Sequence, residues 1–381
     1  MQRPPIPVLL ATAVLATLVV ACGKAPPVAL HPADPPPDRL SDWGVVLADG
    51  QVFEFNAGVV PYDLNTPLFS DYALKLRSVW LPEGTAAAYR EGRELEFPVG
   101  TILSKTFHYE RAGEPGGNPG NEPLEVVRAD RELSLDDGGR LDLDRYVLIE
   151  TRLLVRYEDG WRALPYVWND SQDEAYLELA GDVRSIRFGG EDEGFVYVVP
   201  DVNQCGGCHK PDHTAAELRP LGPRAWQLNR EYRYAAGRRN QLEHWAASGI
   251  LEGVPASVPE GANRATPTDA TLAERARAYL DANCAHCHNA KGPADTSGLD
   301  LTVDAPVDRR YGLCKPPVAV GRGSGDRPYD IYPGRPDDSI LLYRMEHTDP
   351  AIAMPELGRS TVHREGVELI RGWIAALPGD C

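Results

Sequence analysis

The chain has 381 residues, a formal net charge of −17 at pH 7 and 43% hydrophobic residues, which is enough material for two or three domains. So negative a chain is a poor ligand for nucleic acid or for an anionic membrane face, and it favours basic partners. An acidic surface that only keeps an exported protein soluble accounts for the charge equally well.

The first residues have the pattern of an exported lipoprotein. Arg3 precedes an apolar run from Val8 to Ala21, which is too short to span a bilayer comfortably and predicts a signal peptide over residues 1–21. The run ends in LVVAC, which is similar to the bacterial lipobox and predicts that Cys22 carries a lipid. Gly23 stands where an aspartate would favour the inner membrane, so the outer membrane is preferred. An ordinary signal peptide with an incidental cysteine is the alternative.

Residues 22–41 follow as a proline-rich stretch, GKAPPVALHPADPPPDRL after Cys22. Its prolines exclude regular structure and predict a semi-rigid spacer. The folded part of the chain is therefore expected to be tethered to the membrane through the lipid alone.

Residues 42–200 predict antiparallel β structure. Two segments with apolar arms, VVLADGQVFEF and LLVRYEDGWRALPYVW, centre on Asp49-Gly50 and Asp159-Gly160, which are strong signals for short hairpins. Further strand patterns occur in FPVGTILSKTFHY, YVLIETRLLV and FVYVV. Together they predict a sandwich or barrel-like domain.

Beyond residue 200 the pattern changes to short helical segments with long irregular links, and the motif CxxCH occurs twice. A c-type haem needs two thiols two residues apart, for bonds to its two vinyl groups, and an imidazole at the next position for the iron. We therefore expect two covalently bound haem c groups, one in residues 201–258 and one in residues 266–381. The attachment cysteines and the proximal histidines are Cys205, Cys208 and His209 in the first motif, and Cys284, Cys287 and His288 in the second.

Two other uses of the cysteines fit less well. Zinc would need four ligands at finger or ribbon spacing, and a thioredoxin-like site would need a βαβ pattern beside CxxC. His286 lies between the cysteines of the second motif, cannot reach the same iron and is expected to be a solvent-facing loop residue.

Two helical patterns surround the second motif. A capping box at Thr271–Glu274 begins a helix that leads to Cys284, and VELIRGWIAAL near the C-terminus carries an apolar stripe. Gly366 and Gly372 indicate close helix approach, since each costs about 1 kcal/mol inside a helix. Two helices crossing around one haem are typical of small cytochromes c. The predicted fold class is therefore α+β multidomain, a β sandwich or barrel-like domain followed by mainly α-helical cytochrome c segments.

Met354, in the loop DPAIAMPELG, is the expected distal ligand of the second haem, because cytochromes c present methionine from such proline-containing loops. Met345 and His347 are its competitors. The distal ligand of the first haem stays undecided between an open position and the side chains of His213, His244, His108 and Met345. Cys314 and Cys381 are left over and are expected to pair if the geometry allows, because spare cysteines in an oxidising compartment usually form disulfides.

Several segments resemble a family of exported dihaem c-type cytochromes of unassigned physiological role. They include TPLFSDYALKLRSVWLPEG, FPVGTILSKTF, ETRLLVRYEDGWRALPYVWN, NQCGGCH, LGPRAWQLNR, LDANCAHCHN, CKPPVAVGRGSG and MPELGRS, and the resemblance covers most of the chain after residue 42. The β-rich part leading into the first CxxCH is also similar to a module attached to quinoprotein-type sugar dehydrogenases. The resemblance implies an electron-accepting partner of a dehydrogenase rather than the catalyst.

The leading hypothesis is a non-catalytic electron-transfer protein that relays electrons in the periplasm or at the outer membrane, from a partner dehydrogenase to a downstream carrier. The alternative is a dihaem peroxidase-type enzyme with one five-coordinate haem. A third hypothesis makes the β domain a module that recruits a carbohydrate-oxidising partner. The sequence contains no nucleotide-binding fingerprint, nucleophile elbow or H-E-x-x-H motif.

Overall fold

The structure is a computed structural model that describes residues 25–113, 122–130, 135–136, 139–192, 194–210, 212–215, 217–266, 270–318 and 321–381. The expected signal peptide and the expected lipidation site at Cys22 lie outside the described residues. Within the described ranges, no helix has the length and apolar character needed to cross a membrane.

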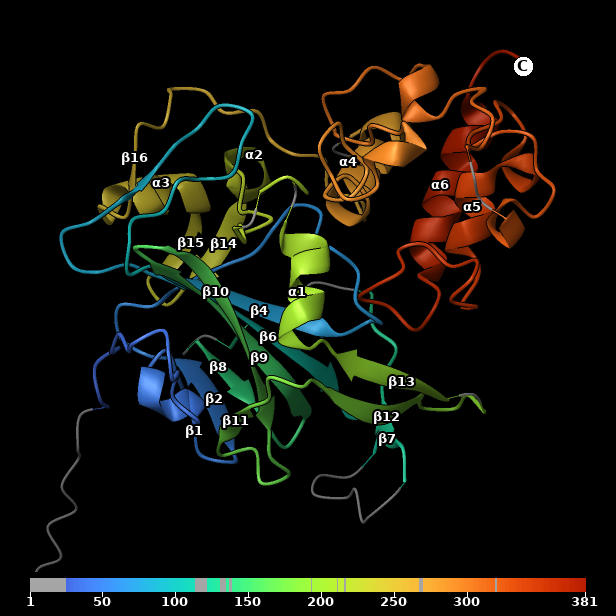
Figure 1. Cartoon of the computed structure of the whole chain (residues 1–381). Helices are drawn as coiled ribbons and strands as arrows, with labels where there is room; N and C mark the ends of the chain where they lie inside the picture. Colours follow the sequence, from blue (N-terminus) through green and yellow to red (C-terminus); the bar gives the residue numbers. More distant parts are fainter. Residues whose placement is uncertain are drawn as a thin grey trace, which may run out of the picture.

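A six-stranded antiparallel sheet forms the base of the molecule (Figure 1). Its strands, in spatial order, are β11 (Ala175–Leu177), β10 (Gly160–Trp168), β9 (Tyr146–Tyr157), β6 (Ile102–Glu110), β4 (Leu74–Trp80) and β3 (Val60–Tyr62). The hairpin predicted at Asp159-Gly160 is confirmed as the turn between β9 and β10. This sheet matters for function because one of its faces forms the floor of the main cavity.

Two three-stranded sheets accompany the large one. One contains β1 (Val46–Ala48), β2 (Val52–Phe55) and β8 (Arg140–Asp142), and the other contains β7 (Leu124–Val126), β12 (Asp182–Phe188) and β13 (Gly194–Val199). The β1–β2 hairpin predicted at Asp49-Gly50 is confirmed, with Gly50 at φ 86° and the Asp49 carboxylate accepting hydrogen bonds from the backbone N–H groups of Gln51 and Val52. The largest apolar core, around Trp43 and Phe53, includes residues of the β1–β2–β8 sheet and of the six-stranded sheet.

Residues 201–258 pack directly on the β region. They form α1 (Val202–His209), α2 (Ala225–Leu228), β14 (Glu231–Tyr234), β15 (Gly237–Asn240), α3 (Gln241–Ala247) and β16 (Leu251–Glu252). β16 pairs in parallel with β5 (Ala87–Ala88), and the ring of Trp245 packs edge-on against Tyr62. The boundary expected near residue 200 therefore does not separate two apolar cores.

The C-terminal lobe contains α4 (Leu272–Asn283), α5 (Ile340–Met345) and α6 (Arg364–Ala376), which lie together in Figure 1. The capping box at Thr271 and Glu274 is confirmed. Helices α4 and α6 pack closely, and a Cβ at Gly366 would overlap the Tyr279 hydroxyl. Gly372 has more room, since the nearest atom to its Cβ position is Leu272 Cδ2 at 4.0 Å.

The predicted fold class is wrong in its helical part. The protein is strand-rich, with 27% strand and 20% helix, and the described residues include only six α-helices. The segments after residue 200 are therefore not mainly α-helical. The reason is that their helical periodicity is confined to short stretches. Gly- and Pro-containing links such as residues 292–318 and 321–339 form turns and short 3₁₀ segments instead.

The proline-rich stretch is also less detached than expected. Residues 25–41 have almost no regular structure, but they lie against the β region. The backbone N–H of Ala29 donates to Trp43 O, the Asn56 amide donates to Pro26 O, and the Tyr166 hydroxyl donates to Pro37 O. Residues 25–41 are therefore packed on the folded part and do not form a free spacer.

Candidate functional site

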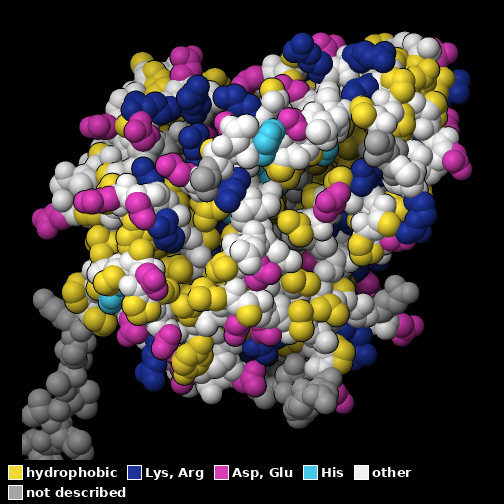
Figure 2. All heavy atoms as spheres, in the orientation of Figure 1, with side chains coloured by type: hydrophobic (Ala, Val, Ile, Leu, Met, Phe, Trp, Pro, Cys, Tyr) yellow, Lys and Arg dark blue, Asp and Glu magenta, His cyan; other side chains and the backbone are white. Residues whose placement is uncertain are grey.

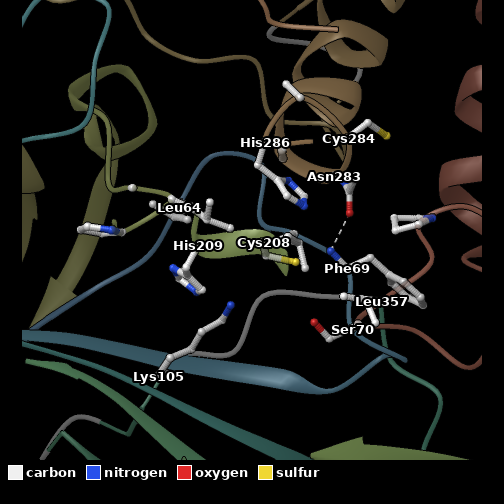
Figure 3. A pocket seen from close by; sticks show the side chains of 18 of the residues that line it. Leu64, Phe69, Ser70, Lys105, Cys208, His209, Asn283, Cys284, His286 and Leu357 are labelled. Carbon is white, nitrogen blue, oxygen red and sulfur yellow. Dashed lines mark hydrogen bonds between the residues drawn. The ribbon is translucent and has the colours of Figure 1, made fainter. Parts of the chain in front are cut away.

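One large cavity, of about 770 Å³, lies between the six-stranded sheet, α1 and the C-terminal lobe. Its volume is in the range of cofactor and ligand sites. Figure 2 shows histidine side chains at the surface between the two upper lobes, and Figure 3 shows the interior with His209 and His286. The predicted site residues that line it are Cys205, Cys208, His209, Cys284 and Met354.

The first motif lies on α1, which begins with a capping box. The Asp201 carboxylate accepts hydrogen bonds from the N–H groups of Asn203 and Gln204, and the Gln204 side chain accepts one from Asp201 N. Cys205 and Cys208 are three residues apart on this helix, a spacing that places them on the same face. Both remain free thiols.

His209 ends α1 with its ring held in one orientation. Its Nδ1 lies 2.8 Å from Arg219 O, so this nitrogen carries the proton and donates it, which leaves Nε2 with a free lone pair. Burial lowers the pKa of His209 to about 4, so the ring is neutral at pH 7. A neutral imidazole oriented through Nδ1–H is the usual state of a metal-ligating histidine.

The second motif follows α4 and orients its histidine in the same way. His288 Nδ1 lies 3.0 Å from Ser297 Oγ, and the Ser297 hydroxyl donates to Ala294 O at 2.7 Å. The hydroxyl therefore accepts from Nδ1–H, and Nε2 of His288 keeps its lone pair. Burial lowers the pKa of His288 to about 4. Cys287 and His288, unlike Cys284, are not part of the cavity lining.

The two motifs touch. The Cys287 thiol lies 3.6 Å from the carbonyl oxygen of Gly207, which belongs to the first motif. A Cβ at Gly207 would stand 2.7 Å from Leu357 Cδ1, so glycine at this position lets the loop that carries Met354 pack against α1. The two CxxCH motifs, which are about 75 residues apart in sequence, are therefore in contact in the folded protein.

The loop of Met354 is fixed by buried polar groups. The Arg359 guanidinium donates to the carbonyl oxygens of Arg344, His347 and Met354. The Asp71 carboxylate accepts from the N–H groups of Ser360 and Thr361, each at 2.7 Å. These bonds hold Met354 at the cavity. Its two competitors are placed differently: Met345 reaches the cavity from the C-terminal core and is 6% exposed, and His347 Nδ1 is hydrogen-bonded to Tyr343 O.

The floor of the cavity carries a row of cations that sequence reasoning missed. Arg77 on β4, Lys105 on β6 and Arg152 on β9 stand directly opposite one another in the strand register, an arrangement that is destabilising for like charges. Arg77 pairs with Asp63 at 2.6 Å and Arg152 pairs with Glu150 at 2.7 Å.

Among the described residues, no carboxylate pairs with Lys105, the third member of this row. Its Nζ lies 5.0 Å from the ring of Phe107. Burial, and next the charges of Arg77 and Arg152, lower the pKa of Lys105 to about 7. A bound carboxylate would relieve this repulsion. The sequence does contain a signal for this row, namely charged residues within apolar strand patterns. Because such residues are rarely buried without a partner, they indicate a binding site or a buried ion pair.

Segments that lie far apart in the chain meet around the cavity. Phe69 N donates to the Asn283 side chain at 2.8 Å (Figure 3), which joins the segment TPLFSDY to the residue before Cys284. Arg224, from LGPRAWQLNR, pairs with Asp281 of the second motif's helix and with Glu94. These contacts attach the helix before the second motif to the β region and to the segment after α1.

Thiol redox and zinc binding are disfavoured by the cysteines themselves. Burial raises the pKa of all four motif thiols, to about 12 for Cys284 and Cys287, whereas a reactive CxxC needs a lowered thiol pKa. The four sulfurs also do not meet as a tetrahedral set. In the described part of the chain, the only group of three metal-ligating side chains whose ligand atoms lie within 4.8 Å of one another is Asp130, His363 and Glu365.

That group is better explained as an ion network. Arg264 places two nitrogens against the two carboxylate oxygens of Asp130, so a metal ion bound to Asp130 would face a guanidinium. Tyr72 donates to Glu365 at 2.8 Å. The network connects the β region to the C-terminal lobe.

Two further site predictions have clear outcomes. His286 was expected to face solvent and does not: it is half-buried and lines the cavity on the side opposite the sheet (Figure 3). The loop after α4 turns inward here because Asn283 is bound to Phe69 N. Cys314 and Cys381 are joined by a disulfide, which attaches the C-terminus to the lobe.

No family model, curated protein or solved structure matches the chain in comparisons with known proteins.

Proposed function

We propose that this chain is a dihaem c-type cytochrome that relays electrons. The observation that carries the proposal is the contact between the two CxxCH motifs beside one cavity, which is lined by Cys205, Cys208, His209 and Cys284. Both motif histidines are anchored through Nδ1, which leaves Nε2 with its lone pair. The free state of the four thiols and the cationic floor fit covalent attachment of an acidic, largely apolar cofactor.

Each motif would supply two attachment cysteines and one iron ligand. Cys205 and Cys208 would attach the first haem and Cys284 and Cys287 the second, with His209 and His288 as proximal ligands and Met354 as the distal ligand of the second. Bound haem supplies one-electron chemistry. Arg77, Lys105 and Arg152 would neutralise carboxylates of the cofactor, and the apolar walls exclude water, which tunes the potential.

Location and partners belong to the same proposal. The lipobox-like LVVAC would anchor the protein through Cys22, facing the periplasm and preferably at the outer membrane. A disulfide between Cys314 and Cys381 supports an oxidising compartment. With a net charge of −17, the protein would favour basic surfaces on its donor dehydrogenase and downstream carrier.

The test is a haem count on the full chain expressed with a haem-maturation system. The pyridine haemochrome assay should give two haems per chain. The pair substitution Cys205→Ala/Cys208→Ala should leave one, and so should Cys284→Ala/Cys287→Ala. A chain without covalent haem would overturn the proposal. Electron paramagnetic resonance of the oxidised protein should show low-spin iron, whereas a high-spin haem that turns over peroxide would favour the dihaem peroxidase alternative.

A further inference from the structure

We infer that His286 supplies the distal ligand of the first haem, so that the attachment loop of the second haem completes the first haem's iron site. This rests on the proposed function. It replaces the open choice among His213, His244, His108 and Met345 with a residue that the sequence had assigned to solvent.

The position of His286 carries the inference. It and His209 line the same cavity from different walls, His209 from α1 near the sheet and His286 from the loop that follows α4 (Figure 3). The contact between Cys287 Sγ and Gly207 O, 3.6 Å, fixes the two motifs against each other. Both imidazoles therefore border the same space.

The chemistry of His286 also fits. It cannot serve the second haem while Cys284 and Cys287, on either side of it, are bonded to that haem. Among the described residues no hydrogen bond is found for its ring nitrogens, in contrast to Nδ1 of His209 and of His288.

The other histidines considered for this role lie outside the cavity lining. Nδ1 of His213 lies 2.9 Å from Lys291 O and its side chain is 44% exposed. The His244 ring packs on Tyr234 with centroids 3.7 Å apart, and His108 is fully buried in β6 beside Tyr146. None of the three lines the cavity.

Three further cavity residues are rivals. His363 lines the cavity too, but its Nδ1 lies 3.0 Å from the Tyr279 hydroxyl and its Nε2 lies 3.5 Å from the Asp130 carboxylate. Met345 belongs to the C-terminal core, and Lys105 reaches toward His209 from the floor (Figure 3). An amine is a possible iron ligand, but Lys105 shares its row with Arg77 and Arg152 and is better placed to meet a carboxylate. The experiment below separates imidazole, amine and thioether ligation.

The experiment uses the full chain matured with haem. In the oxidised wild type, electron paramagnetic resonance and near-infrared magnetic circular dichroism should show one bis-histidine haem and one histidine–methionine haem, both low-spin. His286→Ala should halve the low-spin content and create one high-spin haem, with the haemochrome count unchanged. Added imidazole should restore the low-spin state.

Two companion variants make the result specific. His213→Ala, which removes a neighbouring histidine outside the cavity lining, should leave both haems low-spin. His286→Met should convert the bis-histidine signal into a second histidine–methionine signal and raise the potential of that haem, because thioether ligation favours the reduced iron.

The outcomes separate the two proposals. Two low-spin haems in His286→Ala, a high-spin haem already in the wild type, or loss of the low-spin state in His213→Ala would each overturn the ligand assignment while the dihaem function stands. A chain without covalent haem would overturn both.

Discussion

Backbone hydrogen bonds hold Met354 at the cavity. Its N–H donates to Arg344 O at 3.0 Å, and its carbonyl accepts from Arg359. A substitution of the side chain should therefore leave the loop in place. This makes the residue a clean test of the thioether ligand.

Met354→Ala should remove the sulfur-to-iron charge-transfer absorption from one oxidised haem and lower the potential of that haem, because a thioether stabilises reduced iron. The haemochrome count should stay at its wild-type value. Met345→Leu is the control: it changes the methionine buried in the C-terminal core at similar volume, so the band should persist. If the band survives Met354→Ala and disappears in Met345→Leu, the ligand is Met345.

At the level of helices and strands, the sequence predicts features that depend only on residues close together in the chain. The hairpin turns at Asp49-Gly50 and Asp159-Gly160 and the cap at Thr271 depend on residues within a few positions, and each formed as expected. The inward turn of His286 and the alignment of Arg77, Lys105 and Arg152 depend on contacts between distant segments, which a single sequence does not encode in any short pattern. The helical content after residue 200 was overestimated because short apolar stripes do not distinguish a helix from a buried loop.

The close packing of α4 and α6 is an element-level feature that can be tested with two glycines of the same helix. At Gly366 an added Cβ would overlap the Tyr279 hydroxyl and lie 2.7 Å from His363 Nδ1. Both partners are buried, so neither can move without disturbing the core. Gly366→Ala should therefore lower the free energy of unfolding by about 1–3 kcal/mol, as overpacked substitutions do.

Gly372→Ala is the matched control, because its Cβ would be in ordinary contact with Leu272. Alanine has the better helix propensity by about 1 kcal/mol, so this variant should be as stable as wild type or slightly more stable. Urea denaturation followed by circular dichroism measures both. Equal effects of the two substitutions would mean that α4 and α6 are not in close contact at Gly366.

At the scale of the whole molecule, the cavity exists because the C-terminal lobe is fixed to the β region. The buried joint contains Asp130, Arg264 and His363. Burial alone would raise the pKa of the Asp130 carboxyl, but contacts with His363 and with the Arg264 guanidinium hold this pKa well below its usual range. Since the folded state binds this proton less tightly than the unfolded state, the stabilisation is present above the unfolded pKa of about 3.9 and is lost as the pH falls below it.

Asp130→Asn should lower the free energy of unfolding by about 3 kcal/mol at pH 7, because it leaves the mostly buried Arg264 without its counter-charge. At pH 3 the difference from wild type should be smaller by about 1 kcal/mol, as the unfolded wild-type carboxyl takes up a proton there. Asp170→Asn is the control, because the Asp170 side chain is 99% exposed and 3.8 Å from Arg184, and its effect should stay within about 0.5 kcal/mol. A loss for Asp130→Asn that is the same at both pH values would show that the joint depends on packing and hydrogen bonds rather than on charge.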